Sequence, residues 1–303
     1  MKPSIFTLQE TKRKLTDPPI KAENLVNYQI FELNREVDKK DGGKGVAGGG
    51  LAIGALHDLN PILVRQGDDS VECLTIEVKA ANISFMCVTG YGPQIHDTSD
   101  RKERFWKYLD EEAKSAVQRE VGIIFQIDSN AWAGENLIPG DNNKQNNNGV
   151  LLEKFLEDNP GLVIVNSLSC CIGKITRHRE TTMGTEEAIL DLYIVCQRIL
   201  PLIKHMEVDH DGKYLLTNFR PIMKGKKVTC TDHKAVILTL DLTFSKLKLP
   251  RSNYFNFQNK DDQMKFFNMT TNTNILSNSF STHQTLEAQA KVWNRNLHKI
   301  IQQ

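Results

Sequence analysis

Short apolar segments alternate with polar turns along the first 245 residues. Segments of this length that are rich in β-branched residues are typical of buried or half-buried strands. We expect strands at 4–8, 28–33, 73–79, 83–89, 121–127, 162–165, 188–195 and 234–244. Strands interrupted by only a few helices favour an α/β sandwich, in which two sheets pack together and helices lie outside them.

Three segments have the apolar spacing of a helix. Apolar residues recur at helical period from 105 to 117, and Asp100 and Glu103 ahead of them have capping-box spacing. Asn148 is placed to cap a second helix, and a third is expected over 282–301, beyond a polar linker. We therefore predict a domain of residues 1–245, followed by a linker and mainly helical extension of residues 246–303.

Composition narrows the class of protein. The 303 residues are 40% hydrophobic, and 38 basic against 37 acidic residues give a net charge of +1, so only local clusters could attract nucleic acid. The six cysteines lack Cys-x-x-Cys spacing, which favours buried reduced thiols over zinc ligands or disulfides. Without a membrane-spanning run or a signal-peptide pattern, we expect an intracellular protein of nucleus or cytoplasm, neither secreted nor membrane-bound.

Polar residues stand where apolar segments end. The segment 121–127 leads into Asp128 and Asn130, which would face one cleft if the backbone stays extended; an Asx-turn is the alternative. Asp191 lies among apolar residues, and because an unpaired buried carboxylate is costly, it must have a partner, face a cleft or point to solvent. Other polar residues at segment ends are Glu10, Tyr91, Asp232 and His233.

Five short motifs, in this order, resemble those of the exonuclease/endonuclease/phosphatase superfamily, which includes pancreatic deoxyribonuclease and the apurinic/apyrimidinic endonucleases. The motifs are Gln9-Glu10-Thr11, Tyr91-Gly92-Pro93, Asp128-Ser129-Asn130, Leu190-Asp191 and Thr231-Asp232-His233. The resemblance covers residues 1 to about 245. It implies a four-layer α/β/β/α sandwich of two mixed β-sheets, to which the mainly helical C-terminal extension is added.

The resemblance also implies a chemistry, the Mg²⁺-dependent hydrolysis of phosphodiesters. Glu10 and Asp232 would be the metal ligands, with Mn²⁺ as an alternative ion and no nucleotide cofactor. Asp128 would orient or deprotonate water, while other side chains hold the phosphate. The catalytic residues implied in this way are Asp128, Asn130, His233, Asp191 and Tyr91.

Finer features resemble the endonuclease domains of non-LTR retrotransposons: the glycines at 48–50, the sequence 129–132, and Asn148-Gly149. They favour DNA as partner and nicking as the reaction. Lys174, Arg177 and Arg179 are the candidate DNA-backbone contacts, or else a solvated strand face. The alternatives are a phosphatase for small or lipid phosphates, which needs a closed pocket, and a catalytically weakened relic of the endonuclease. The sequence gives no oligomeric state.

The chain departs from the family pattern in places. Ile127 stands where Gly is usual, Ser129 replaces a common Phe, and Gly90 precedes the tyrosine. The family's first strand, which carries an Asn beside the metal site, would precede residue 4. We therefore expect this strand to be missing, leaving an unpaired sheet edge and a weakened activity.

Overall fold

The computed structural model describes residues 3–21, 23–35, 49–68, 70–80, 83–181, 184–211 and 232–242. The chain divides into two compact units, Met1–Leu247 and Lys248–Gln303, and the second lies outside the described residues. The linker and the helix expected at 282–301 also lie there, so the domain division stays a prediction.

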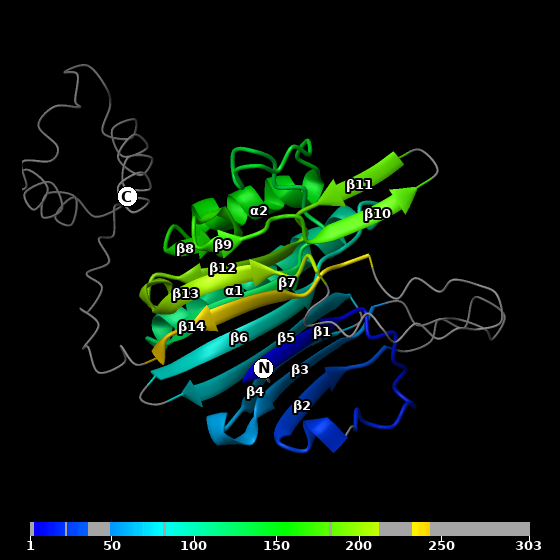
Figure 1. Cartoon of the computed structure of the whole chain (residues 1–303). Helices are drawn as coiled ribbons and strands as arrows, with labels where there is room; N and C mark the ends of the chain where they lie inside the picture. Colours follow the sequence, from blue (N-terminus) through cyan, green and yellow to red (C-terminus); the bar gives the residue numbers. More distant parts are fainter. Residues whose placement is uncertain are drawn as a thin grey trace, which may run out of the picture. The chain divides into compact units, whose positions relative to one another are not determined.

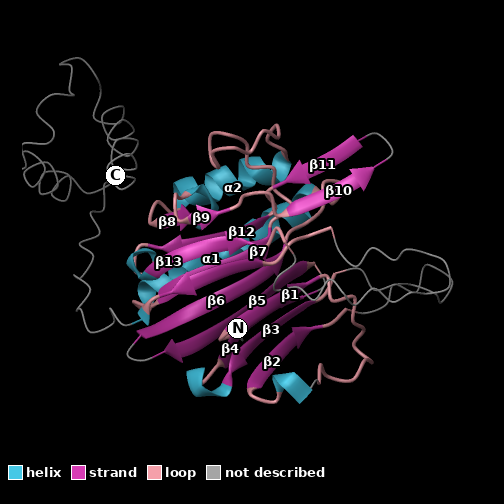
Figure 2. Ribbon diagram, viewed as in Figure 1, coloured by secondary structure: helices cyan, strands magenta, loops and turns pink. Residues whose placement is uncertain are grey.

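A six-stranded mixed sheet, in the order β4-β5-β6-β7-β12-β8, is the largest sheet of the fold (Figures 1 and 2). Strands β6 and β7 are parallel and are joined through a helix, whereas the other neighbours are antiparallel. The central strands are apolar on both faces because both faces are covered. The strand bounds are β4 (Ile62–Asp68), β5 (Val71–Ala80), β6 (Ile83–Tyr91), β7 (Gly122–Asp128), β8 (Leu162–Ile164) and β12 (Asp191–Cys196).

Two three-stranded sheets form the second layer, in the orders β1-β3-β2 and β14-β13-β9. In the first, β3 packs against β5 and β6, and β1 packs against β6 and β7. In the second, the Val236 carbonyl accepts a hydrogen bond from the Tyr193 hydroxyl of β12, at 3.2 Å. The bounds are β1 (Ile5–Gln9), β2 (Tyr28–Leu33), β3 (Leu51–Leu56), β9 (Cys171–Ile172), β13 (Ile203–Val208) and β14 (Val236–Leu240).

Both α-helices of the described residues, α1 (Ser99–Gln118) and α2 (Asn147–Asp158), lie on the other face of the six-stranded sheet (Figure 2). Helix α1 packs on β5, β6 and β7, and α2 packs on α1. Phe155 of α2 stacks edge-on against Phe125 of β7, with ring centroids 5.7 Å apart. The predicted α/β sandwich, with mixed sheets and few helices, is confirmed.

The predicted helix caps were wrong by two residues each. The N-cap of α1 is Thr98, whose hydroxyl accepts from the Arg101 N–H, so the capping box at Asp100 does not form. The N-cap of α2 is Asn146, whose side chain accepts from the Gly149 N–H at 2.8 Å. Each true cap lies among several good capping residues, between which local propensity does not choose. Asn148 is instead buried inside α2.

The strands that were not predicted are β4, β9, β11 (Gly184–Ala188) and β13. β11 forms a hairpin with β10 (Arg177–Thr181), which lies in a segment predicted as a basic strand or loop. The hairpin extends away from the sheets in Figure 1. Its register pairs Arg179 with Glu186, so that a basic and an acidic residue lie side by side. The short 3₁₀ turns are η1 (Glu23–Leu25), η3 (His57–Leu59), η4 (Val165–Ser167) and η5 (Leu200–Leu202).

The five cysteines within the described residues are free thiols, and Cys73, Cys87 and Cys196 are buried, as predicted for that part of the chain. Within the same residues, no helix combines the length and the apolar character needed to cross a bilayer.

Candidate active site

Three neighbouring strands of the six-stranded sheet carry polar residues at the same end of the sheet. Tyr91 ends β6, Asp128 ends β7 and Asp191 begins β12. The strand register pairs Tyr91 with Asp128, and Asp128 with Asp191. The three residues therefore form one row across adjacent strands. Asp191 is thus the first residue of its strand and not, as predicted, an acid in the middle of it.

His233 is the partner of Asp191, so the first of the three arrangements considered for this carboxylate is the one found. Its Nδ1 donates to Asp191 Oδ2 at 2.9 Å, and its Nε2 lies 3.9 Å from Asp128 Oδ2. The backbone around His233 is held by the hairpin, because the His178 N–H donates to the Asp232 carbonyl and the Lys234 N–H donates to the Thr176 carbonyl. The imidazole is therefore fixed between two carboxylates of the row.

The charges of this group shift its protonation. Burial by itself would lower the pKa of His233, but the hydrogen bond and charge of Asp191, with the charges of Asp128 and Asp232, raise the pKa to about 9. Burial, together with the charges of Asp191 and Glu10, raises the pKa of Asp128 to about 7, although the charge of His233 opposes the rise. His233 is thus cationic at neutral pH, while Asp128 can exchange a proton there.

Glu10 and Tyr91 meet across the two layers. Glu10 follows β1 directly, and its Oε1 accepts a hydrogen bond from the Tyr91 hydroxyl at 2.5 Å. Gln94 Nε2 donates to the same hydroxyl at 3.0 Å. Burial and the nearby Glu10 carboxylate raise the pKa of Tyr91, so the phenol keeps its proton. The Glu10 side chain is 42% exposed and can still be reached from solvent.

Asn130 does not lie where extended backbone would put it. Its φ is +46°, in the left-handed region, and its N–H donates to Asp128 Oδ1 at 3.2 Å. The Asx-turn alternative therefore describes this segment. Asn130 Nδ2 donates to the Gly92 carbonyl at 2.7 Å, and the Gly92 N–H donates to the Asp128 carbonyl. Asn130 thus ties the end of β7 to the loop after Tyr91.

The remaining predicted residues lie on or near the hairpin. Arg177 Nε donates to Asp232 Oδ2 at 2.9 Å, and this bond lowers the pKa of Asp232 despite the opposing effect of burial. Lys174 Nζ donates to the Pro139 carbonyl, and Arg179 is exposed. Arg177 therefore supports the carboxylate next to His233, while Arg179 is exposed on the hairpin, where its register partner is Glu186.

The donor atoms of Asp128, Asp191 and His233 all lie within 4.8 Å of one another, a grouping that could hold a metal ion. Hard carboxylate oxygens suit Mg²⁺. Burial first, and then the negative charge of Asp191, raises the pKa of Asp128, and a divalent cation beside it would favour the charged carboxylate. The two carboxylates of this group therefore fit the ion that the sequence implied, whereas His233, which is protonated, is a hydrogen-bond donor and not a metal ligand. Of the predicted ligands, Glu10 is hydrogen-bonded to Tyr91, which is the strand neighbour of Asp128. The carboxylate of Asp232 accepts a hydrogen bond from Arg177 instead.

Three residues that bind the backbone at the start of β12 were not predicted from the sequence. Thr176 Oγ1 is buried and accepts from the N–H groups of Leu190 and Asp191, at 2.9 and 3.1 Å. Ser129 Oγ donates to the Leu190 carbonyl at 2.8 Å, and Asn166 Nδ2 donates to the Asp191 carbonyl at 3.0 Å. No local pattern distinguishes these residues from other polar residues of turns.

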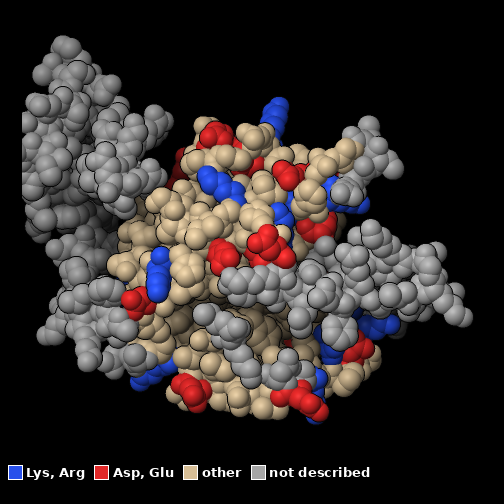
Figure 3. Space-filling model, viewed as in Figure 1, with Lys and Arg blue, Asp and Glu red and all other residues tan. Residues whose placement is uncertain are grey.

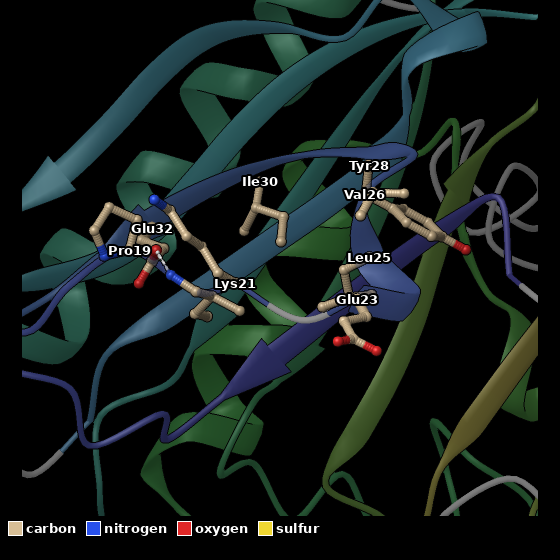
Figure 4. A pocket seen from close by; sticks show the side chains of 9 residues that line it. Pro19, Lys21, Glu23, Leu25, Val26, Tyr28, Ile30 and Glu32 are labelled. Carbon is tan, nitrogen blue, oxygen red and sulfur yellow. Dashed lines mark hydrogen bonds between the residues drawn. The ribbon is translucent and has the colours of Figure 1, made fainter.

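The surroundings of the site are mixed in charge. On the face shown in Figure 3, acidic and basic side chains of the described residues are interspersed. A hollow of about 580 Å³ lies on the β2 side, where Ile30 and Tyr28 of β2 face Leu25 and Val26 (Figure 4). The hollow is separate from the candidate site, because no residue of the site lines it. These site residues, called the rim below, are Glu10, Tyr91, Asp128, Asn130, Asp191, Asp232 and His233.

Known structures share this architecture. A 3′-5′ exonuclease, NExo, from Neisseria meningitidis matches with a TM-score of 0.54 and 15% identity, over 79% of this chain and 90% of that chain. A structure of the 3′ phosphatase NExo from Neisseria bound to product DNA hairpin matches with 0.54 and 15%, over 79% and 89%. An AP endonuclease from Archaeoglobus fulgidus matches with 0.54 and 16%, over 79% and 89%. No protein-family model and no curated protein sequence matches the chain.

These similarities establish the fold that the sequence motifs implied. The chain has the fold of exonuclease/endonuclease/phosphatase proteins, and its structural neighbours are nucleases and phosphatases. An identity of 15 or 16% supports the fold alone. The chemistry must therefore be argued from the rim residues themselves.

Proposed function

We propose that this protein is a divalent-metal-dependent phosphodiesterase that nicks DNA inside the cell. The proposal rests on one observation: the donor atoms of Asp128, Asp191 and His233 converge within 4.8 Å, beside a hydrogen-bonded tyrosine and glutamate, on a fold shared with nucleases. Phosphodiester hydrolysis requires a positioned water, neutralisation of the phosphate charge and a stabilised leaving oxygen, and this group of residues can meet these needs.

Each rim residue has a role that its surroundings support. Asp128, with a pKa near 7, is suited to accept a proton from water, since an acceptor works best near the operating pH. His233 is kept cationic by Asp191 and is suited to hold a phosphate oxygen. The Tyr91 hydroxyl and the Asn130 amide are the neutral donors of the rim.

A divalent cation bound here, Mg²⁺ or Mn²⁺, would neutralise phosphate charge and lower the pKa of a bound water. Asp128 and Asp191 are the carboxylates that would hold such an ion, and Glu10, whose charge acts on Asp128, is the third carboxylate of the proposed set. Asp232 is the fourth carboxylate of the proposed set, and Arg177 holds it in place.

A polymeric substrate suits the rim better than a small phosphate. The side chains of Glu10 and His233 are 42% and 28% exposed, so the reactive atoms can be approached from the surface. The adjacent hairpin carries Arg179, and Lys174 precedes it, in reach of a backbone that extends beyond the rim. The NExo structure with product DNA hairpin is a precedent on this fold. An origin in a non-LTR retrotransposon remains part of the proposal and rests on the sequence features alone.

The test is the nicking of supercoiled plasmid by the full chain, with Mg²⁺, with Mn²⁺ and with EDTA. We expect nicking that needs the metal and that falls at least 100-fold in Asp128→Asn and His233→Gln, in the range of lost acid–base groups. A matched control is His205→Gln, because His205 bonds Thr239 in the other sheet and does not adjoin the rim. Equal rates in the wild type and Asp128→Asn would contradict the assignment.

The same proteins should be assayed with p-nitrophenyl phosphate and with a soluble inositol phosphate. Turnover of these small substrates without any plasmid nicking would replace DNA with a small phosphate as the substrate. Failure of both reactions, in a folded protein that binds Mn²⁺, would favour the relic of the endonuclease.

A further inference from the structure

A buried carboxylate outside the rim, that of Glu72, joins the segments that carry Glu10 and Tyr91. Glu72 is the second residue of β5, and its side chain is 1% exposed. Its Oε2 accepts from the Gly50 N–H at 2.6 Å. Its Oε1 accepts from Arg101 Nη2 at 3.2 Å and from Arg35 Nη2.

The first connection leads from Glu72 to Glu10. The carbonyls of Gly50 and Gly49 accept from the N–H groups of Thr11 and Lys12, at 3.1 and 2.8 Å, directly after Glu10. Glu10 itself has a φ of +53°, a conformation that a non-glycine residue keeps only when its surroundings hold it. A Cβ at Gly49 would lie 2.1 Å from Glu72 Oε2, so the chain approaches the carboxylate as closely as glycine permits.

The second connection leads from Glu72 to Tyr91. Arg101, bound to Glu72, also donates from Nη1 to Asp97 Oδ1 at 2.9 Å. Asp97 Oδ2 accepts from the Gln94 N–H at 2.6 Å, and Gln94 Nε2 donates to the Tyr91 hydroxyl. One buried carboxylate thus reaches both members of the hydrogen bond between the tyrosine and the glutamate, which lie on different sheets.

Stability alone does not account for such a residue. A buried ion pair often stabilises a fold no more than apolar side chains of the same size would. Glu112 of α1 is a comparable buried glutamate, 4% exposed, and bonds Arg65 of the edge strand β4 at 3.1 Å. The two glutamates share burial and an arginine partner, but only the partners of Glu72 lead to the rim.

We propose that Glu72 is a positioning residue, which sets the placement of Glu10 relative to Tyr91 and thereby the geometry of the divalent-cation site. The inference rests on the proposed function only in requiring that the rim binds a divalent cation. Glu72 touches neither cation nor substrate. It acts through the backbone of Gly49 and Gly50 on one side and through Arg101 on the other.

The test measures Mn²⁺ affinity by electron paramagnetic resonance on the full chain, together with the melting temperature. Glu72→Gln should bind Mn²⁺ at least ~10-fold more weakly, the loss typical of residues that support metal ligands. Glu112→Gln should lower the melting temperature to a similar degree without changing Mn²⁺ affinity. Gln94→Ala removes an exposed link to Tyr91 and should weaken binding severalfold with an unchanged melting temperature.

A loss of affinity in Glu72→Gln matched by an equal loss in Glu112→Gln would show a general effect of destabilisation and overturn the inference. Unaltered Mn²⁺ affinity in Glu72→Gln, or a wild type that binds no Mn²⁺, would overturn it too. A wild type that binds Mn²⁺ and does not nick DNA would remove the proposed function only, since the affinity measurements would still decide the role of Glu72.

Discussion

Asp128 and Asp191 are paired directly across the antiparallel strands β7 and β12, so two carboxylates occupy neighbouring positions where these strands meet at one end of the sheet. Like charges in such positions repel each other. The repulsion is reduced by His233, which donates to Asp191 and lies 3.9 Å from Asp128. Burial of Asp128 raises its pKa most, and the charge of the paired Asp191 adds to the rise. Four predictions follow from this row and its supports.

The first prediction concerns the protonation of His233. In the metal-free protein, the ring signals of His233 should titrate with a pKa of about 9 in nuclear magnetic resonance spectra. In Asp191→Asn the pKa should fall, because burial then acts against the charges of Asp128 and Asp232 alone. His205→Gln supplies the matched control, and its His233 titration should be unchanged. A His233 pKa that is the same in Asp191→Asn would contradict the ion pair.

The second prediction is a pH dependence of stability. The folded pKa of His233, about 9, lies above the value of about 6.5 in an unfolded chain. Its contribution to the free energy of unfolding is therefore complete below pH ~6.5 and is lost as the pH rises through about 9. Urea unfolding of the metal-free protein should show this decline, and the decline should be smaller in Asp191→Asn. An equal decline in both proteins would assign it to other groups.

The third prediction is that Asp128→Asn stabilises the metal-free protein while it removes activity. A carboxyl group whose pKa is raised by folding makes the fold less stable once the pH exceeds its unfolded value, and the penalty is complete above the folded pKa of about 7. At pH 8 the asparagine should raise the free energy of unfolding by ~1–3 kcal/mol, as residues of functional sites often do when replaced. The gain should vanish near pH 4, and a loss of stability at pH 8 would contradict the repulsion.

The fourth prediction concerns Thr176, which holds the start of β12. Thr176→Val removes the acceptor of two buried N–H groups and should lower the free energy of unfolding by ~2–5 kcal/mol. It should also shift the titration of His233, since Asp191 loses a backbone anchor. Thr176→Ser keeps the oxygen and is the control. A valine variant as stable as the serine variant would show that these hydrogen bonds contribute little.

The sequence was sufficient to predict which polar residues stand at the ends of strands. The change from apolar to polar after 121–127 predicted the end of β7 at Asp128, and the alternation in 234–244 predicted β14 behind His233. These signals are local, because burial follows the period of a strand and each strand must end where its apolar residues end. The order of the motifs predicted the fold, and the structural neighbours confirm it.

Tertiary structure decided how those residues meet. Only the register of β7 and β12 makes Asp128 and Asp191 neighbours, and only the hairpin beside them places His233 at Asp191. The left-handed backbone of Asn130 and the buried position of Glu72 likewise depend on segments distant in sequence. Hydrogen bonds and charge pairs between distant segments leave no period in the sequence, because a polar residue of a turn reads alike whether its partner is water or a buried backbone group.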